Sequence, residues 1–229
     1  MSFRVMRSSM RPEAPNYIES KVILRTAPNF YARAGKRLLD IILVLLAAPI
    51  ILPLLAVIAA VIALDGKSPF FTQERVGRYG RTFRMWKLRS MVVNAEAQLE
   101  RCLAAYPERR LEWDEHQKLR DDPRVTRIGH FIRKSSLDEL PQFLNVLKGE
   151  MSVVGPRPMM CNQKDMYPAS EYFEMRPGIT GAWQTSARNE SSFRERAAYD
   201  SDYFYKLSLL TDLKIVLRTF GVVVRATGH

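Results

Sequence analysis

The sequence predicts a mostly α-helical α/β protein that is membrane-associated, in which a re-entrant apolar helix precedes one compact cytoplasmic domain. Three observations lead to this prediction: an uncharged apolar stretch, basic residues on both sides of it, and helix, strand and Gly/Pro-loop signals beyond it. The expected organisation is a flexible basic tail over residues 1–28, the membrane helix over residues 29–64 and the domain over residues 65–229.

The apolar stretch runs from Ile41 to Leu64 without a charged residue. Its 24 residues, at about 1.5 Å each, are long enough to cross a hydrocarbon core of roughly 30 Å. Pro49 and Pro53 lie near its middle, where each removes a backbone donor and clashes with the preceding turn. The sequence therefore predicts a bend that lets the helix enter and leave the membrane on one side.

Basic residues dominate both flanks of this stretch. Residues 1–37 carry eight basic and two acidic residues, and residues 65–91 carry seven basic and two acidic residues. Lys and Arg beside an apolar segment keep that flank in the cytoplasm, so both flanks are expected on one face. A straight span and a buried core helix remain as alternatives. A signal peptide is disfavoured because the stretch begins late, is too long and has no small-residue cleavage site after it.

Composition narrows the classes of ligand. The 229-residue chain has a net charge of +11 and a sequence pI near 9.9, which suits anionic lipid, phosphorylated ligands or nucleic acid. The apolar stretch favours the first two, and the lack of an aromatic-basic recognition motif disfavours nucleic acid. Cys102 and Cys161 show no metal-ligand spacing and are expected to be reduced thiols.

Residues 29–40 are expected to begin the membrane helix, with Asp40 paired to Lys36 or Arg37 on the same helix. After a turn at residues 65–69, the alternating groups FFTQ and TFRMWKL predict a short hairpin close to the membrane. The basic residues of this hairpin fit a solvated face, an anionic-lipid face or a phosphate site.

Helical periodicity organises most of the remaining chain. Residues 94–121 predict polar helix interrupted by Pro107, and apolar residues at i, i+3, i+4 and i+7 predict a helix from about Leu137 to Lys148. A charged helix over residues 192–207 precedes a last helix over about residues 208–225. That last helix is apolar on one face, which fits a membrane interface or, nearly as well, packing on the core.

Asp138 and Glu139 lie at the start of the predicted helix in a basic neighbourhood. One interpretation is a capping box, since Ser136 and Glu139 have the S-x-x-E spacing. The other is that the helix terminus and nearby cations keep a carboxylate ionised, so that it binds Mg²⁺ or attacks phosphorus. Likewise, residues 155–158, GPRP, fit either an ordinary turn or a rigidly held Arg157 that binds phosphate.

Several motifs in this order resemble the bacterial sugar transferase family, the monotopic polyprenyl-phosphate phosphoglycosyl transferases that initiate exopolysaccharides. They are KRLLD, the Pro-broken apolar run, FFTQERVGRYGRTFRMWKLRSM, RKSSLDELPQFLNVLKGEMSVVGPRP, RPGITGAWQ and TDLKI. The resemblance covers about residues 29–225 and implies a re-entrant helix at the cytoplasmic face of the bacterial inner membrane, with anionic lipids around it. It also implies transfer of a sugar 1-phosphate from a UDP-sugar to undecaprenyl phosphate, with release of UMP.

The resemblance also assigns roles to residues. Asp138 matches the family's nucleophile and Glu139 its partner in an Asp-Glu dyad, and both are expected to hold Mg²⁺. The expected substrate-binding arginines are Arg89, Arg133, Arg157 and Arg188. Asp138 would attack the β-phosphorus, and Glu139 would orient the metal or act as a base.

This chain departs from the family pattern at three places. Leu52-Pro53 replaces the usual Ser-Pro at the helix break, no Gly precedes Arg188, and Ala182 stands between Gly181 and Trp183. These departures bear on the choice of sugar and on membrane geometry, and the exopolysaccharide-like C-terminal half favours galactose or glucose. The block of several N-terminal membrane helices found in larger relatives is absent, so the chain resembles the small form of the family.

Two other functions remain open, and so does a homodimer. A membrane-bound phosphatase could use the same aspartate with water as acceptor, and a silent scaffold of a polysaccharide assembly complex would need no chemistry at all. The intact dyad and both phosphate-binding arginines argue against the scaffold.

Overall fold

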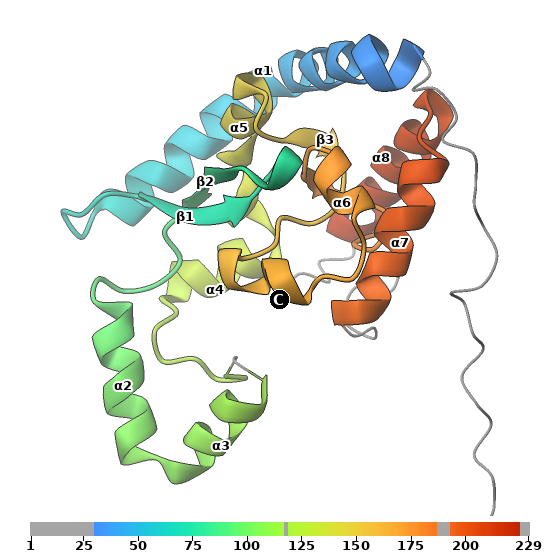
Figure 1. The fold of residues 1–229 in the computed structure, drawn as a ribbon. Helices are drawn as coiled ribbons and strands as arrows, with labels where there is room; N and C mark the ends of the chain where they lie inside the picture. Colours follow the sequence, from blue (N-terminus) through green and yellow to red (C-terminus); the bar gives the residue numbers. More distant parts are fainter. Residues whose placement is uncertain (1–29, 117–118, 187–192, 225–229) are drawn as a thin grey trace, which may run out of the picture.

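The structure is a computed structural model that describes residues 30–116, 119–186 and 193–224. Three parts of it matter for function: a long apolar helix, a compact body built around two small β-sheets, and a helical arm (Figure 1). The predicted basic tail, residues 1–28, lies outside the described residues.

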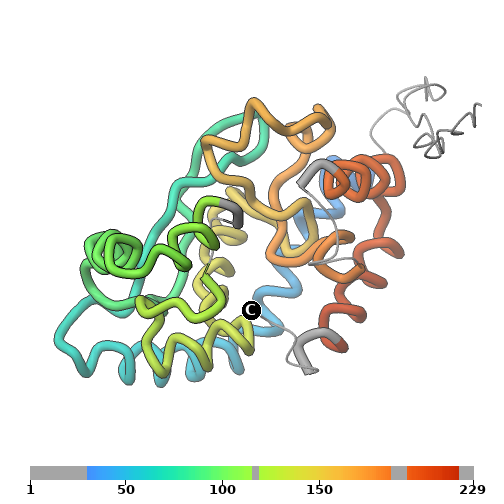
Figure 2. Tube along the Cα trace, turned by 90° about the horizontal axis from the view of Figure 1, so that it is seen from below, coloured from blue at the N-terminus to red at the C-terminus, as the bar shows by residue number. Residues whose placement is uncertain are grey.

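Helix α1 spans Lys36–Ala63 and is preceded by a π-helical turn, Tyr31–Gly35. Pro49 and Pro53 lie inside it, and its two halves run in different directions in both views (Figures 1 and 2), which confirms the predicted bend. Only 11% of its most apolar 18-residue window is buried, and the helix is long and apolar enough to cross a membrane. Its large exposed side chains include Leu45, Leu46, Ile50 and Val57.

Both ends of α1 contact the same body. Near its start, Arg37 donates to the carbonyl oxygen of Leu147 at 2.8 Å. Near its end, Ile58 and Ile62 are buried in one apolar cluster with Leu88 and Ile132. The body therefore lies along α1 on one side, while the opposite side of the helix stays apolar and exposed.

The sequence prediction for Asp40 was wrong about its partner. Asp40 is buried and accepts hydrogen bonds from the Ser152 hydroxyl and the Val153 backbone N–H, both at 2.8 Å. Lys36 instead pairs with Asp212, and Arg37 donates to backbone carbonyls. Periodicity within one helix cannot reveal a partner that lies more than one hundred residues away. Here that partner binds Asp40 Oδ1, whereas Oδ2 has no hydrogen-bond partner within the described residues.

The predicted hairpin is confirmed. Strand β1, Phe70–Val76, pairs antiparallel with β2, Thr82–Leu88, and Tyr79 and Gly80 in the connecting turn have φ of 59° and 70°. Phe83 and Met85 of β2 belong to a core cluster. Its other buried residues are Val44, Val146 and Met151. This cluster fastens the hairpin between α1 and the helix that follows the dyad.

Helices α2, Ala95–Ala105, and α3, Pro107–His116, form an arm that projects from the body (Figure 1). Pro107 is the first residue of α3, where its missing N–H would have no intrahelical partner anyway. The predicted interruption at Pro107 is therefore confirmed.

The predicted helix from Leu137 to Lys148 is split into two pieces. After α4, Arg127–Lys134, the chain forms a 3-10 turn, Leu137–Glu139, and then α5, Gln142–Lys148. Pro141 has no N–H to donate, so the α-helical hydrogen-bond pattern is interrupted there, although Leu140 and Pro141 both keep right-handed α backbone angles. The dyad therefore sits in a short turn before the helix.

Strands β3, Ser152–Val154, and β4, Gly178–Thr180, form a parallel pair, with a 3-10 segment, Cys161–Met166, and α6, Glu171–Glu174, between them. Glycines let the loops at these strands touch: a Cβ built on Gly178 would lie 2.1 Å from the Gly155 nitrogen. The two Gly/Pro segments of the sequence are thereby brought together.

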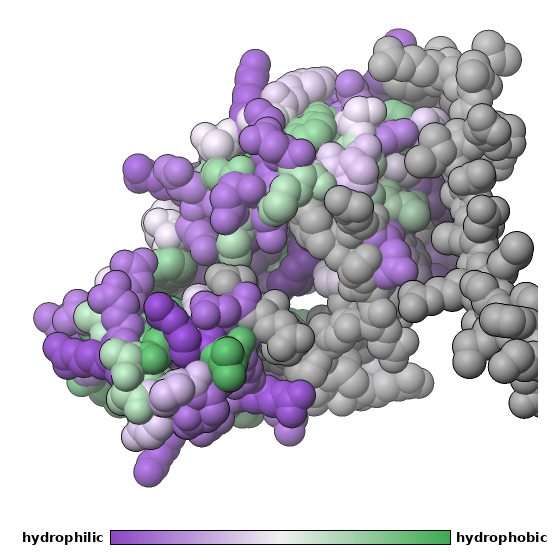
Figure 3. Space-filling view, turned by 60° about the horizontal axis from the view of Figure 1, so that its bottom comes forward, coloured by the Kyte–Doolittle hydropathy of each residue, from purple (hydrophilic) through white to green (hydrophobic). Residues whose placement is uncertain are grey.

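Helices α7, Phe193–Tyr205, and α8, Leu209–Val224, close the body, as predicted from periodicity. Helix α8 buries Asp212 and Ile215 against the core and leaves Leu210, Leu217 and Phe220 exposed. Packing on the core is thus confirmed for one face of α8, and the membrane-interface interpretation of its exposed face stays a prediction. The molecular face that points away from α1 is mostly hydrophilic among its described residues (Figure 3).

Candidate active site

The Asp-Glu dyad lies in the 3-10 turn between α4 and α5. Ser136, which precedes the turn, adopts a left-handed φ of 57° and makes no side-chain cap bond within the described chain. The capping-box interpretation is therefore wrong. Asp138 is only 8% exposed, so its carboxylate is held at the surface of the body and is not a free solvated group.

Lys87 of β2 bridges the two carboxylates. Its Nζ lies 3.4 Å from Asp138 Oδ2 and 3.0 Å from Glu139 Oε1. Burial raises the pKa of the Asp138 carboxyl above its ordinary value, the Lys87 ammonium lowers it, and the negative charge of Glu139 raises it. The pKa of Asp138 is raised overall, and the Lys87 ammonium is the group that opposes this rise most strongly.

Two of the predicted arginines lie beside the dyad. Arg157, from the GPRP segment, has its NH2 atom 4.0 Å from Glu139 Oε1 and keeps 43% of its side chain exposed. Arg133, from the last turn of α4, donates from Nε to the Ser90 hydroxyl at 2.8 Å. Burial lowers the pKa of the Arg133 guanidinium, and the negative charge of Asp138 raises it. Arg133 is therefore close enough to Asp138 for the two charges to interact.

Arg89 is not brought to the dyad. Arg89 binds both carboxylate oxygens of Asp65 at 2.7 Å and donates to the Ser68 carbonyl at 2.8 Å. It thereby closes the turn that leads from α1 into β1 and is not among the residues that line the cleft described next. Arg188 lies outside the described residues.

A cleft opens beside the dyad, between the hairpin and the two Gly/Pro segments. Its described lining consists of Arg75, Met85, Lys87, Glu139, Gln142, Arg157, Pro158, Gly178, Ile179 and Gln184. Sequence reasoning missed Gln142 and Gln184 as functional residues. It left Arg75 and Lys87 among the basic residues of the hairpin, with a phosphate site as one of three alternatives.

A sequence signal for Arg75 and Lys87 existed. In TFRMWKL, strand alternation places Lys87 on the same face as Phe83 and Met85, which are buried. Arg75 is the cross-strand partner of Phe83 and so shares that face. A charged residue on the buried face of a hairpin is a stronger indication of a site than the same residue on the solvated face.

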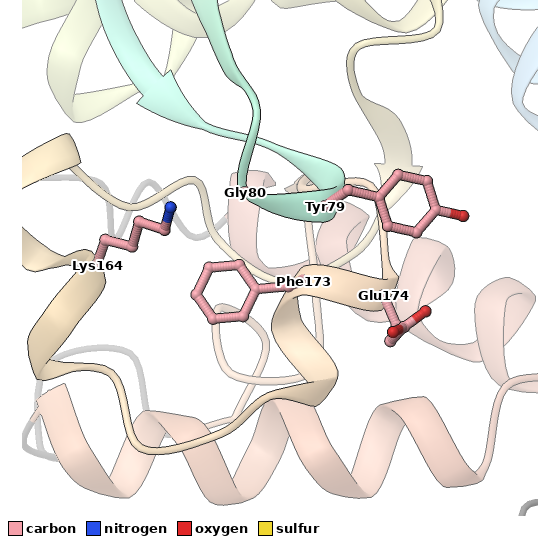
Figure 4. Close-up of a pocket in the computed structure, with 5 residues that line it drawn as sticks. All are labelled: Tyr79, Gly80, Lys164, Phe173 and Glu174. Atoms are coloured by element: carbon pink, nitrogen blue, oxygen red, sulfur yellow. The ribbon is translucent and has the colours of Figure 1, made fainter.

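A second hollow, of about 360 Å³, lies at the hairpin turn and is lined by Tyr79, Gly80, Lys164, Phe173 and Glu174 (Figure 4). The Lys164 side chain points toward the hairpin, and Tyr79 and Glu174 extend outward. It shares no lining residue with the cleft and contains a single lysine and a single carboxylate. Despite its volume, it offers no grouping suited to phosphoryl chemistry.

The dyad fits Mg²⁺ only in part. Mg²⁺ in enzymes that bind phosphates is held by one or two carboxylates together with substrate phosphates and water, and the dyad supplies two carboxylates. Within the described residues, no group of three or more His, Cys, Asp or Glu side chains could hold a metal ion without a substrate. The Lys87 ammonium shows that the pair already accommodates a cation.

Chemically, the arrangement is a buried carboxylate surrounded by cations from three elements: Lys87 from β2, Arg133 from α4 and Arg157 from the GPRP segment. Cations around a carboxylate keep it charged and attract phosphate to it. Such a site suits attack by the carboxylate on phosphorus, because the same cations neutralise the charge of the phosphoryl group.

Comparison with known proteins places the chain in a family. The bacterial sugar transferase family model matches residues 31–226. A UDP-galactose-lipid carrier transferase of Erwinia amylovora is 45% identical over 212 residues, which cover 90% of this chain and 44% of that protein. An undecaprenyl-phosphate galactose phosphotransferase of Salmonella typhimurium is 40% identical over 212 residues, with the same two coverages of 90% and 44%.

The chain thus spans less than half the length of these two relatives. By contrast, exopolysaccharide production protein ExoY of Rhizobium meliloti is 40% identical over 197 residues, which cover 85% of this chain and 87% of that protein. The residues of this chain that the family model matches include the dyad, the GPRP segment and α1. The chain belongs to the bacterial sugar transferase family.

Proposed function

We propose that this protein transfers a sugar 1-phosphate from a UDP-hexose, galactose or glucose, to undecaprenyl phosphate and releases UMP, the first membrane step of exopolysaccharide synthesis. The observation that supports this most is Asp138, a buried carboxylate that pairs with Lys87, next to a cleft lined by Lys87, Glu139 and Arg157. Relatives named for galactose and glucose transfer to a lipid carrier or to undecaprenyl phosphate agree with it.

The proposed reaction has two displacements at phosphorus. An Asp138 oxygen attacks the β-phosphorus of the UDP-sugar, the bond from that phosphorus to the bridging oxygen breaks, and UMP leaves. An oxygen of undecaprenyl phosphate then attacks the same phosphorus and the acyl-phosphate bond breaks, which frees Asp138. Arg157 and Arg133 offset the negative charge that both steps concentrate beside the dyad.

Glu139 and Lys87 position Asp138 and adjust its charge, and neither forms a covalent bond with the substrate. We propose that Asp138 and Glu139 hold Mg²⁺ together with the donor diphosphate, and the ion would supply charge neutralisation there. Glu139 orients this arrangement and binds Lys87, whose ammonium keeps Asp138 in its ionised form before donor arrives.

We also propose that α1 is re-entrant and that the body lies at the cytoplasmic face of the inner membrane. At about 1.5 Å per residue, a straight helix of this length would separate its ends by about 40 Å. Both ends instead contact one body, through Arg37 at the start and Ile62 at the end. The exposed apolar faces of α1 and α8 supply surface for lipid, and the basic flanks favour anionic headgroups.

UMP release tests the function. Purified full-length protein should release UMP from UDP-galactose or UDP-glucose in proportion to added undecaprenyl phosphate, and the lipid product should carry the hexose and two phosphates. Continued turnover without lipid, with free sugar phosphate as product, would identify a phosphatase. No release under either condition, with UDP-galactose, UDP-glucose and their N-acetyl forms, would favour the scaffold.

Thiol labelling tests the topology. Single cysteines replacing Phe30 and Lys67, in a chain that carries Cys102→Ala and Cys161→Ser, mark the two ends of α1. A membrane-impermeant reagent added to the periplasmic side should label neither end and should label both after the membrane is opened. Labelling of one end from the periplasm would contradict re-entrance and establish a straight span.

A further inference from the structure

The side chain of Gln184 is buried in the cleft without a hydrogen-bond partner. Gln184 is 6% exposed, it lines the cleft together with Glu139 and Arg157, and neither its Nε2 nor its Oε1 has a partner in the part of the chain that the structure describes. It follows β4 in the loop that the Gly155 and Gly178 contact fixes in place. A Cβ at Gly181 would lie 2.7 Å from Gln184 Oε1, so the bare glycine leaves room for this orientation.

Burial of an amide with both polar atoms unpaired is unfavourable, and folded proteins satisfy nearly all such groups. An unpaired amide in the wall of a cleft, here one of about 30 Å³, is therefore best explained by a ligand group that reaches it. The amide offers one acceptor and a donor group side by side. A phosphate oxygen only accepts hydrogen bonds, so it would leave Oε1 without a donor. Sugar hydroxyls both donate and accept hydrogen bonds and can therefore pair with Oε1 and Nε2 together.

Arg75 supplies the charged half of the same cleft. Its terminal nitrogen donates to Gln73 Oε1 at 2.6 Å, but its Nε has no partner within the described residues. Burial lowers the pKa of Arg75 to about 10, and the positive charge of Arg157 contributes to this shift. Two guanidinium groups that repel each other across a cleft form a site for an anion.

We propose that Gln184 is a specificity-determining residue that binds a pair of hydroxyls on the donor hexose, and that Arg75 beside it binds the donor diphosphate. The inference rests on the proposed function, because it places the hexose in the cleft that Glu139 shares. The hexose is bonded directly to the phosphorus that Asp138 attacks, whereas the α-phosphate and ribose separate the uracil from it. Gln184, which shares the cleft with Glu139 next to Asp138, is therefore assigned to the hexose.

The test measures binding separately from chemistry. Each variant is made in full-length protein that carries Asp138→Asn, and its affinities for UDP and for the better bound of UDP-galactose and UDP-glucose are measured by calorimetry. Gln184→Leu should weaken UDP-hexose binding by about tenfold, the loss expected when a polar ligand group meets an apolar wall. It should change UDP binding by less than about twofold, because UDP lacks the hexose. Arg75→Met should weaken both ligands by the same factor.

The thermal unfolding midpoint, measured without ligand, distinguishes an effect of a substitution on ligand binding from an effect on folding. Gln184→Leu should leave it unchanged or raise it, because an apolar side chain of similar size replaces an unpaired amide. Gln98→Leu is the matched control: Gln98 Nε2 donates to the Pro123 carbonyl at 3.0 Å near the arm, so this change should lower the midpoint without altering either affinity.

Three outcomes would overturn the inference. Gln184→Leu that weakens UDP as much as UDP-hexose would assign the amide to the nucleotide, and Gln184→Leu that lowers the midpoint would assign it to the fold. Unchanged affinities for both ligands would remove it from the donor site. Failure of the parent protein to bind either UDP-hexose would instead reject the proposed function itself.

Discussion

Two buried polar clusters in this molecule differ in how completely they are paired. The anchor cluster, Tyr31, Lys36, Tyr203 and Asp212, joins the start of α1 to α7 and α8. Lys36 Nζ donates to Tyr203 OH at 2.8 Å and to Asp212 Oδ2 at 2.7 Å, and Tyr203 OH donates to Asp212 Oδ1 at 2.6 Å. Tyr31 OH donates to the same carboxylate.

The cleft beside the dyad is the opposite case. Lys87 pairs with Glu139 at 3.0 Å, but its Nζ lies 3.4 Å from Asp138 Oδ2, and Arg157 lies 4.0 Å from Glu139 Oε1. Gln184 has no partner within the described residues. Charge and burial alone therefore do not mark a site. The fully paired cluster fixes α1 against the body, and the cleft, where Gln184 is left without a partner among the described residues, is available to a ligand.

The largest effect is expected at Asp138. Asp138→Asn keeps the size of the side chain but removes the attacking charge, so turnover should fall by roughly a thousandfold or more. The unfolding midpoint should change little, because the cleft does not hold the fold together. Steady-state UMP release and thermal unfolding in the same detergent measure the two effects, and near-normal turnover would contradict the assignment.

The next effect is expected in the anchor cluster. Asp212→Leu leaves the buried Lys36 ammonium without its counter-charge, and such a loss costs about 3–5 kcal/mol of folding free energy. Adding Lys36→Met should recover much of that loss, because the double variant has no buried charge without a partner at this position. Denaturant unfolding of the two variants tests this. Equal stability of Asp212→Leu and the parent would show that the cluster does not anchor α1.

A third buried carboxylate should make stability depend on pH. Burial raises the pKa of Asp200 to about 6, against the hydrogen bond from Tyr167 and the positive charge of Arg196. The folded state therefore favours protonated Asp200, so its contribution is complete below about pH 4 and is lost as pH rises through about 6. Two pKa units correspond to about 3 kcal/mol.

Asp200→Asn imitates the protonated acid. It should remove the contribution of Asp200 to the fall in unfolding free energy between pH 4 and pH 6. Unfolding free energies of the parent and the variant across that range provide the measurement. If both proteins show the same slope there, Asp200 is already ionised in the folded state at pH 4.

The smallest effect is expected at Lys87. Because its ammonium lowers the pKa of Asp138, Lys87→Met should raise that pKa further and move the acid limb of the turnover profile to higher pH. A shift of about one pH unit would reduce turnover about tenfold on that limb. Lys87→Arg, which keeps the charge, is the control and should keep the limb near its original position.

Local patterns predicted much of the fold. The bend at Pro49 and Pro53, the hairpin and the helices on either side of Pro107 all depend on residues close together in the sequence. The split at Pro141 was missed because apolar spacing was allowed to outweigh a residue that interrupts hydrogen bonding. The pairing of β3 with β4 joins segments more than twenty residues apart and has no local signal.

The site residues, like the fold, were predicted in part from the sequence. Motifs identified Asp138, Glu139, Arg133 and Arg157, which the structure brings close to one another. Lys87 and Arg75 reach them only through the pairing of β1 with β2 and the packing of that hairpin on α5, so they are revealed by tertiary contacts.

The claim that Asp138 is a nucleophile is tested most directly by trapping. UDP-hexose labelled in the sugar is mixed with full-length protein without lipid acceptor, quenched rapidly and analysed by mass spectrometry of the peptide that contains Asp138. The account predicts a hexose phosphate bonded to Asp138 that disappears when undecaprenyl phosphate is added, and no adduct on Asp138→Asn. An unlabelled parent protein that nevertheless turns over at its full rate would contradict the account and establish direct transfer between the two substrates.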